Sequence, residues 1–164
     1  MKKLTPFLWF DAPLEEVIRY YHSIFRNNFT AVHYRRAGQT VTTARFRIHG
    51  QEFMVLNGGP HFKFTPAISF FVSCKTQAEV DGLWNKLSKN GEKSHCGWLK
   101  DRYGISWQIV PEILGKLLAD KDAAKADRVW RAMLKMGKLE IAMLKAAAAA
   151  PPKKNKKAMP RMDA

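Results

Sequence analysis

The sequence of 164 residues lacks the features that mark several common classes of protein. Its two cysteines, Cys74 and Cys96, cannot build a disulfide framework, and the absence of a Cys-x-x-Cys pair excludes the common zinc-binding pattern. The apolar runs are short and broken by charges, far below the roughly 20 residues of a membrane-spanning helix. The segment 4–10 is too short for a signal-peptide core. We therefore expect one cytoplasmic domain with reduced thiols and no membrane partner.

Acidic residues are scarce, because 14 Asp and Glu stand against 28 Lys and Arg, a net charge of +14. Residues 145–164 carry five lysines and one arginine against one aspartate. In the other 144 residues, 22 basic and 13 acidic groups are scattered rather than clustered. A dispersed excess mainly affects solubility and non-specific attraction to polyanions. No nucleic-acid-binding motif accompanies it, so no specific nucleic-acid partner is expected, although the basic tail could bind an acidic partner.

The first third of the sequence, up to residue 56, predicts secondary-structure elements in the order β-α-β-β-β. An aromatic-rich strand is expected over 5–10, and Pro13 suits the first turn of a following helix. Strands are expected over 29–36, 40–48 and 51–56, the second of them alternating in a half-buried pattern. Apolar residues recur at helical spacing between these strands, namely Leu14, Val17, Ile18, Tyr21 and Phe25.

The same order then begins again. A strand is expected over 67–72, a helix over 76–90, and short strands near 92–94, 97–100 and 105–110. Segment 5–10 matches 67–72 in hydrophobic pattern, and 49–56 matches 103–110. A period of roughly 55–60 residues within one small domain predicts two modules facing each other. We place them at about 3–58 and 65–111, within a paired unit of residues 1–112.

The remainder is expected to be helical and then disordered. Helices over 113–118, 123–136 and 138–150 would form an extension, residues 113–148, that packs on the sheet or on a sister subunit. Pro151-Pro152 and the lysine cluster that follows are of low complexity. Residues 149–164 are therefore expected to be a disordered basic tail.

Six segments carry a resemblance to a known family: Thr5–Phe10, Leu56–Pro60, Phe62–Phe64, Cys96–Asp101, Gly104–Pro111 and Ala132–Met136. In these, and in the paired modules, residues 3–145 resemble the vicinal oxygen chelate superfamily of glyoxalase, bleomycin-resistance and dioxygenase relatives. More narrowly they resemble its PhnB-like family, labelled by a 3-demethylubiquinone-9 3-methyltransferase domain. The resemblance implies an α+β fold in which two half-barrel modules enclose a pocket, usually in a homodimer.

The resemblance also places four metal-ligand positions, at about Thr5, Met54, Ala67 and Gln108. Of these only Gln108 could ligate, and a lone amide oxygen is a poor site for a divalent transition metal. We therefore expect neither a metal nor another cofactor. The methyltransferase label implies a glycine-rich turn that enters a helix, whereas Gly58-Gly59 is followed by a proline and a strand. That glycine pair is better explained by a turn with positive φ.

Two residues are weak catalytic candidates. His61 could be a general base and Cys96 a nucleophile, with a loop histidine and a structural cysteine as the alternatives. His95 is not expected to activate Cys96, since neighbours on a strand point to opposite faces unless a bulge intervenes. The same alternation sets Trp107 against Gln108, and the repeat favours Gln108 as the inward one. The expected pocket residues are Trp9, Asn57, His61, Phe64, Trp98, Trp107 and Gln108.

Three functional hypotheses follow, and the third is a binder of nucleic acid or an acidic partner through the basic tail. In the first, a homodimer binds a small aromatic or anionic molecule in the cavity between the modules, without a metal. In the alternative, the chain is an enzyme of the same superfamily. It would be a metal-dependent lyase or dioxygenase, the methyltransferase of the domain label, or a metal-free enzyme using His61 and Cys96.

Overall fold

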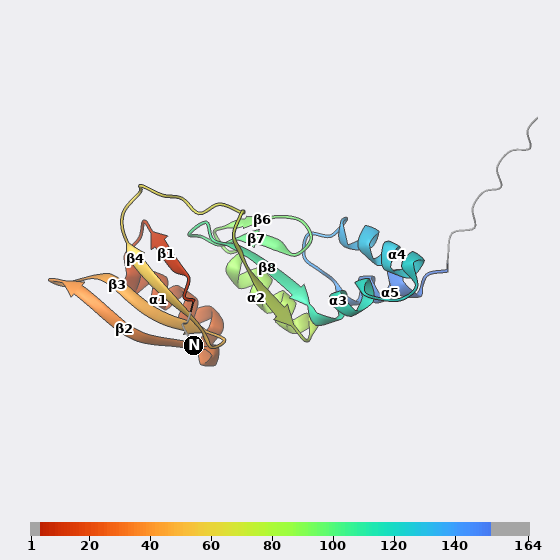
Figure 1. Cartoon of the computed structure of the whole chain (residues 1–164), viewed down its shortest axis with the longest axis horizontal. Coiled ribbons are helices and arrows are strands. Elements are labelled where there is room, and N and C mark those ends of the chain that lie inside the picture. The colour runs from red at the N-terminus through yellow and green to blue at the C-terminus, as the bar shows by residue number, and fades with distance from the viewer. Residues whose placement is uncertain (1–3, 152–164) are drawn as a thin grey trace, which may run out of the picture.

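The computed structural model describes residues 4–151, apart from the side chains of residues 32 and 33, and contains two four-stranded sheets. Figure 1 shows the sheets next to each other, each with one helix against it, and three further helices beyond the second sheet. The order of elements is β-α-β-β-β twice, followed by helices. The expected α+β fold of paired modules with C-terminal helices is confirmed. Most of the expected disordered tail, residues 152–164, lies outside the described residues.

The first module orders its strands β1-β4-β3-β2, with β1 parallel to β4 and the other pairs antiparallel. A stripe of apolar side chains along α1, at the spacing predicted from the sequence, is buried against this sheet. Residues of β3 alternate between buried and exposed from Ala44 to Ile48, as expected of a sheet covered on one face. A bulge before Thr43 breaks the alternation, and Val41 is buried as well. The elements are β1 (Phe7–Phe10), α1 (Leu14–Phe25), the 3-10 turn η1 (Arg26–Asn28), β2 (Phe29–Ala37), β3 (Thr40–Ile48) and β4 (Gln51–Asn57).

The second module repeats the topology with order β5-β8-β7-β6, and β5 runs parallel to β8. Its helix starts at a capping box, in which the Thr76 hydroxyl accepts from the Glu79 amide at 3.2 Å and the Glu79 carboxylate accepts from the Thr76 amide. Its first strand starts two residues later than predicted. The elements are β5 (Ser69–Cys74), α2 (Gln77–Leu87), β6 (Glu92–Lys93), β7 (Trp98–Lys100) and β8 (Ser106–Pro111).

A buried carboxylate joins the two modules. Asp101 is 2% exposed, and its Oδ2 accepts from the Tyr21 hydroxyl of α1 at 2.7 Å and from the Trp107 indole at 2.9 Å. Its Oδ1 accepts from the backbone amides of Tyr103 at 2.9 Å and Ile105 at 3.1 Å. These four donors offset part of the cost of burying the charge, but burial still raises the pKa of the Asp101 carboxyl. One hydrophobic core surrounds this group and contains residues of both modules.

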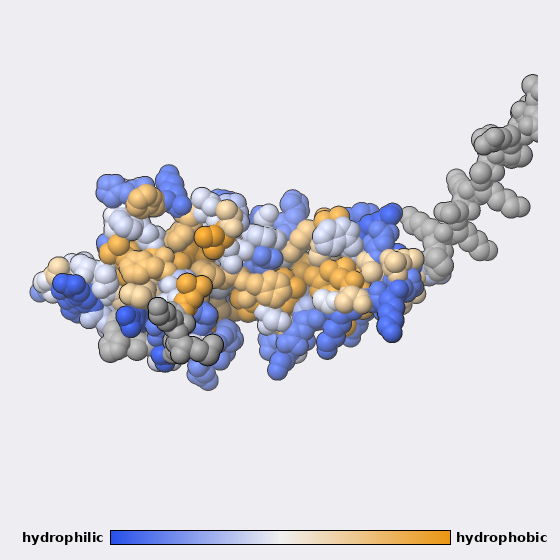
Figure 2. Space-filling model, viewed as in Figure 1, coloured by the Kyte–Doolittle hydropathy of each residue, from blue (hydrophilic) through white to orange (hydrophobic). Residues whose placement is uncertain are grey.

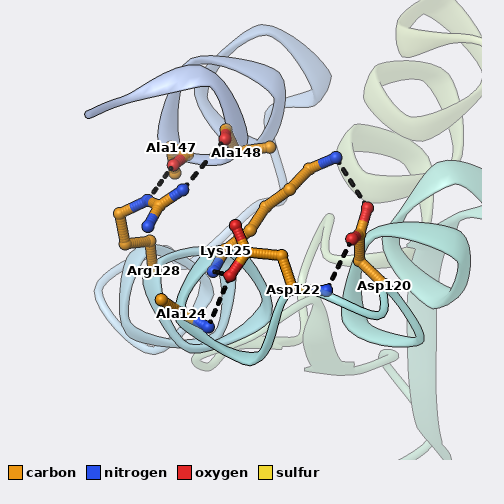
Figure 3. A network of polar contacts seen from close by, with 7 residues as sticks. All are labelled: Asp120, Asp122, Ala124, Lys125, Arg128, Ala147 and Ala148. Carbon is orange, nitrogen blue, oxygen red and sulfur yellow. Dashed lines mark hydrogen bonds and ion pairs between the residues drawn. The ribbon is translucent and has the colours of Figure 1, made fainter. Parts of the chain in front are cut away.

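The C-terminal helices are α3 (Glu112–Leu118), α4 (Ala123–Met133) and α5 (Ile141–Ala149). Asp122 caps α4 by accepting from two amides of its first turn, and Lys125 pairs with Asp120 at 2.6 Å (Figure 3). Arg128 donates to the last carbonyls of α5, which would otherwise lack partners (Figure 3). These contacts tie the three helices into a second, smaller core.

This helical unit is attached to the second module through the corner before β7. The amide of Cys96 donates to the Met136 carbonyl at 2.7 Å, and that of Gly97 to the Gly137 carbonyl at 2.8 Å. Lys138 forms an ion pair with Asp81 of α2. The extension is therefore attached to the corner before β7 and to α2 of its own chain, and it lies beyond the second sheet instead of covering it (Figure 1). Within residues 4–151, no helix combines the length and the hydropathy needed to cross a bilayer.

Candidate functional site

The face of each sheet opposite its helix is called its open face here. In β3, buried Ala44 and Phe46 point to α1, and exposed Arg45 and Arg47 alternate with them. Strand register extends this alternation across each sheet, because directly paired residues share a face. Two rows on the open face of the first sheet are Phe7–Met54–Arg45 and Trp9–Leu56–Thr43. The apolar side chains of β1 and β4 thus form one edge of this open face, beside the Arg45 side chain of β3.

The segment that links the modules folds back on this apolar edge. The Trp9 indole donates to the Gly59 carbonyl at 2.9 Å, and the ring packs edge-on against Phe62 at 5.0 Å. A Cβ at Gly58 would lie 2.1 Å from the Trp9 ring, so only glycine permits this approach. Gly59 has φ of +76°, as expected of the glycine pair. The pair therefore serves the contact with Trp9 and does not lead into a helix.

The open face of the second sheet is more polar. Its rows are Ser69–Ser106–Lys100 and Phe71–Gln108–Trp98. The Gln108 amide donates to the Ser69 hydroxyl at 2.8 Å, and Lys100 pairs with Glu92 at 2.9 Å. Gln108 lies on this open face, and Trp107 lies on the opposite, helix-covered face.

Two cavities border the linker between the modules. The first, of about 270 Å³, is lined mainly by apolar side chains, among them the aromatic rings of Phe7, Trp9, Phe62 and Phe64. The second, of about 450 Å³, is bordered mostly by polar and charged residues of β6, β7 and the turn between them, together with apolar surface such as that of Trp98. Trp98 lies in the second cavity. Three of the expected pocket residues, Trp9, Phe64 and Trp98, thus border the linker cavities.

The other expected residues lie elsewhere. Trp107 is buried under the helices and bonded to Asp101, and only part of it reaches a separate cleft between the modules. Asn57 ends β4 opposite buried Phe10, on the helix-covered face. His61 lies in the linker with an exposed side chain. The structure therefore does not gather all seven residues in one cavity.

The catalytic candidates are not brought together. Cys96 has φ of +57°, so no regular strand sets its direction, and its thiol donates to the Met133 carbonyl at 3.6 Å. It borders the polar cavity with exposed His95, whereas His61 lines neither linker cavity. Cys74 is the other free cysteine, and burial raises the pKa of its thiol to about 11. A thiol so protonated at neutral pH is a poor nucleophile.

Two of the expected metal-ligand positions need correction. Thr5 lies before the start of β1 at Phe7 and is therefore outside the sheet. Because a turn at residues 66–67 precedes β5, Ala67 lies outside the sheet, and Ser69 takes the place beside Gln108. In the first module Met54 stands directly opposite Arg45, whose positive charge opposes a cation nearby. Among the described residues, no group of three His, Cys, Asp or Glu side chains could hold a metal. The residues at the expected metal-ligand positions of the two modules therefore do not fit a divalent ion.

Sequence reasoning missed three groups on or near the open faces. Arg45 could have been found from the alternation of β3, which sets it on the face opposite Phe46. Lys100 and Ser106 face each other only because of the register between β7 and β8. Strands as short as three residues give little sequence signal for register.

Two β-α-β-β-β modules with a polar and aromatic open side define a protein of the vicinal oxygen chelate fold. Within that class the chain belongs to the family described as 3-demethylubiquinone-9 3-methyltransferase, whose model matches residues 2–110.

Solved structures agree with this assignment. A "Putative 3-demethylubiquinone-9 3-methyltransferase, PhnB protein" from Bacillus cereus is 34% identical, with a TM-score of 0.61 over 67% of this chain and 99% of its own. Protein PA1353 from Pseudomonas aeruginosa is 19% identical, with a TM-score of 0.57 over 68% and 98%, and supports the fold alone. The fosfomycin resistance protein FosX from Listeria monocytogenes is 13% identical, with a TM-score of 0.48 over 65% and 88%, and no argument rests on it. No curated protein matches the sequence.

Proposed function

We propose that the protein is a cytoplasmic homodimer that binds a small molecule on the open side of its paired modules, without a metal ion. The observation that carries the proposal is the make-up of the two open faces. They combine aromatic side chains such as Trp9 and Trp98 with cationic and amide groups such as Arg45 and Gln108. Ligand sites typically join an apolar lining to a few polar groups that fix orientation. The two free cysteines suit a reducing compartment.

Binding is favoured over methyl transfer by the local structure at Gly58-Gly59. That pair packs against Trp9, whereas a nucleotide-like cofactor is commonly held at the N-terminus of a helix that follows such a turn. Catalysis by the candidate pair is also disfavoured, since the Cys96 thiol is engaged with a carbonyl and His61 lies in the exposed linker.

Exposed apolar groups near the open side support the homodimer. Phe7 is 52% exposed, Phe71 60% and Ile68 75%. Figure 2 shows an apolar band that runs along this view of the molecule, over both modules and on toward the C-terminal helices. Contiguous apolar surface of this kind is typical of protein interfaces. In addition, β1 and β5 are edge strands of their sheets, and uncovered edges favour pairing.

Light scattering coupled to size exclusion tests the oligomeric state. We expect a mass twice that of the 18.8 kDa chain. Phe71→Glu should shift the protein toward the monomer, because a charge on the open face cannot be buried without a partner. Met143→Glu is the matched control, since Met143 is equally exposed but lies on α5 rather than on a sheet. A wild-type protein that stays monomeric at high concentration would contradict the homodimer.

A ligand screen tests the binding of a small molecule, and a metal analysis tests the proposal that no metal ion is bound. Thermal-shift screening of neutral, cationic and anionic small molecules should yield hits that perturb the Trp98 indole signal in NMR spectra. Elemental analysis of untagged protein should find no stoichiometric metal, and divalent ions should leave the melting temperature unchanged. Stoichiometric metal, or a large shift with one ion, would refute the metal-free proposal and favour the enzymatic alternative.

A further inference from the structure

We infer that Ser106 and Lys100 form an oxyanion subsite that takes the carboxylate of a ligand whose planar body lies against Trp98. This inference rests on the proposed function and specifies the ligand class of the same open side. Its starting point is an unsatisfied group. Ser106 is 2% exposed, and among the described residues its hydroxyl is the one buried side-chain polar atom without a hydrogen-bond partner. A buried hydroxyl without a partner is destabilising and requires an explanation.

The position of Ser106 indicates what the partner is. It borders both linker cavities, the aromatic one of about 270 Å³ and the polar one of about 450 Å³. Linker residues lie between them, because Thr65 and Ile68 line the first cavity and Pro66 lines the second. A small displacement of the linker would therefore expose the hydroxyl to either cavity. A ligand that entered there would meet a donor with no competing partner to displace.

Lys100 supplies the charge. It is the direct cross-strand partner of Ser106, a relation that places the two Cβ atoms about 5 Å apart on the same face. Its ammonium pairs with Glu92 at 2.9 Å, but the Glu92 side chain is 72% exposed. Such exposed ion pairs contribute little, so an incoming anion can replace Glu92 at small cost. A hydroxyl donor beside an ammonium favours an oxyanion, since charge-assisted hydrogen bonds are about twice as strong as neutral ones.

Trp98 defines the rest of the ligand. It lies two residues before Lys100 on the same strand, faces the same side and lines the same cavity. An indole beside an anion subsite favours a flat apolar body. Lys100 also contacts no other acidic partner among the described residues than Glu92. The chemistry therefore points to a small aromatic or conjugated carboxylate.

Benzoate and benzyl alcohol are suitable probes, since they share a ring and differ in charge. Titrations would follow the Trp98 indole signal in NMR spectra of the full chain. We expect benzoate to bind at least about 10-fold more tightly, and Ser106→Ala to weaken benzoate about 10-fold while leaving benzyl alcohol unchanged. Lys100→Met should act in the same direction. Glu92→Gln, which frees the ammonium, should strengthen benzoate binding.

A second readout separates this role from a structural one. Without ligand, Ser106→Ala should keep or raise the melting temperature, because it removes an unsatisfied hydroxyl. Ser23→Ala, an exposed serine on α1, is the matched control and should change neither property. A lower melting temperature of ligand-free Ser106→Ala would show that a bound water already satisfies the hydroxyl, and would overturn the inference. Equal binding of the two probes would overturn it too but leave the proposed function standing, whereas failure of every small molecule to bind would refute both.

Discussion

Asp101 is the most direct polar link between the two modules, and its replacement tests how they are joined. Asp101→Asn keeps the size of the side chain but converts one carboxylate oxygen into a donor. If the amide oxygen stays on the backbone amides of Tyr103 and Ile105, the new NH₂ group faces Tyr21 and Trp107. The Tyr21 hydroxyl can rotate and accept. The Trp107 indole cannot, because it is a donor only.

The size of the effect follows from these contacts. A hydrogen bond to a charged group contributes about 1.5–3 kcal/mol, and a buried donor left without a partner costs about 1–3 kcal/mol. The loss is partly offset, because burial disfavours the charged carboxylate and raises the pKa of Asp101. We expect Asp101→Asn to lower the free energy of unfolding by about 3 kcal/mol. Tyr21→Phe removes one donor and leaves the others, so about 1.5 kcal/mol is expected for it.

Urea unfolding followed by tryptophan fluorescence measures these losses. All variants must be compared at one protein concentration, since a dimer gains apparent stability with concentration. The double variant should lose less than the sum of the two single losses, by about 1 kcal/mol, because each single change already abolishes the hydrogen bond from the Tyr21 hydroxyl to a charged carboxylate. Asp11→Asn, at an exposed carboxylate, is the control and should have little effect. If Asp101→Asn unfolds within about 0.5 kcal/mol of the wild type, the carboxylate does not hold the modules together.

Three other perturbations have defined outcomes. Gly58→Ala places a Cβ 2.1 Å from the Trp9 ring, so it should lower stability by about 1–3 kcal/mol and shift the Trp9 indole signal in NMR spectra. The raised pKa of Asp101 makes the folded state bind this proton more tightly than the unfolded state. The stability that this proton linkage contributes is complete below the unfolded-state pKa of about 4 and is lost as pH rises through the folded-state pKa of Asp101. In urea unfolding, the difference in free energy between the wild type and Asp101→Asn should therefore shrink as pH rises between these two pKa values. Deleting residues 152–164, which hold five basic residues, should reduce salt-sensitive retention on heparin, and unchanged retention would show that the tail is not the polyanion-binding segment.

Much of the fold could be predicted because its elements are encoded locally. The apolar spacing over Leu14–Phe25 gave a helix whose observed bounds are the same. The alternation in residues 40–48 predicted a strand with one covered face. The structure confirms the strand, and the alternation holds from Ala44 to Ile48, whereas Val41 is buried out of phase because of a bulge. The repeated order of elements then followed from the pattern alone. Each of these patterns can be read from residues that lie close together in the sequence.

The site was harder to predict because it depends on register and on distant contacts. Tyr21 and Asp101 are 80 positions apart, and no local pattern pairs them. The turn before β5 moved the strand by two residues, which replaced Ala67 by Ser69 beside Gln108. A shift of a strand by two residues keeps each side chain on the same face of the sheet but changes which residues lie next to it on the neighbouring strand. Lists of candidate ligands carried across a repeat are sensitive to such a shift.

The position of α1 and α2 on one face of their sheets explains why the other side of the molecule is available for binding. Each helix covers its own sheet, and the two also meet each other's modules, as in the hydrogen bond from the Tyr20 hydroxyl to the Leu87 carbonyl at 3.2 Å. Because the helix-covered faces share one core, the open faces are left to be covered by the linker, a ligand or a second copy. If a ligand and a second copy share that surface, ligand binding and dimerisation are thermodynamically linked. A carboxylate that binds at Ser106 should then raise the dimer fraction at low protein concentration, whereas Glu92→Gln should increase that response by freeing Lys100.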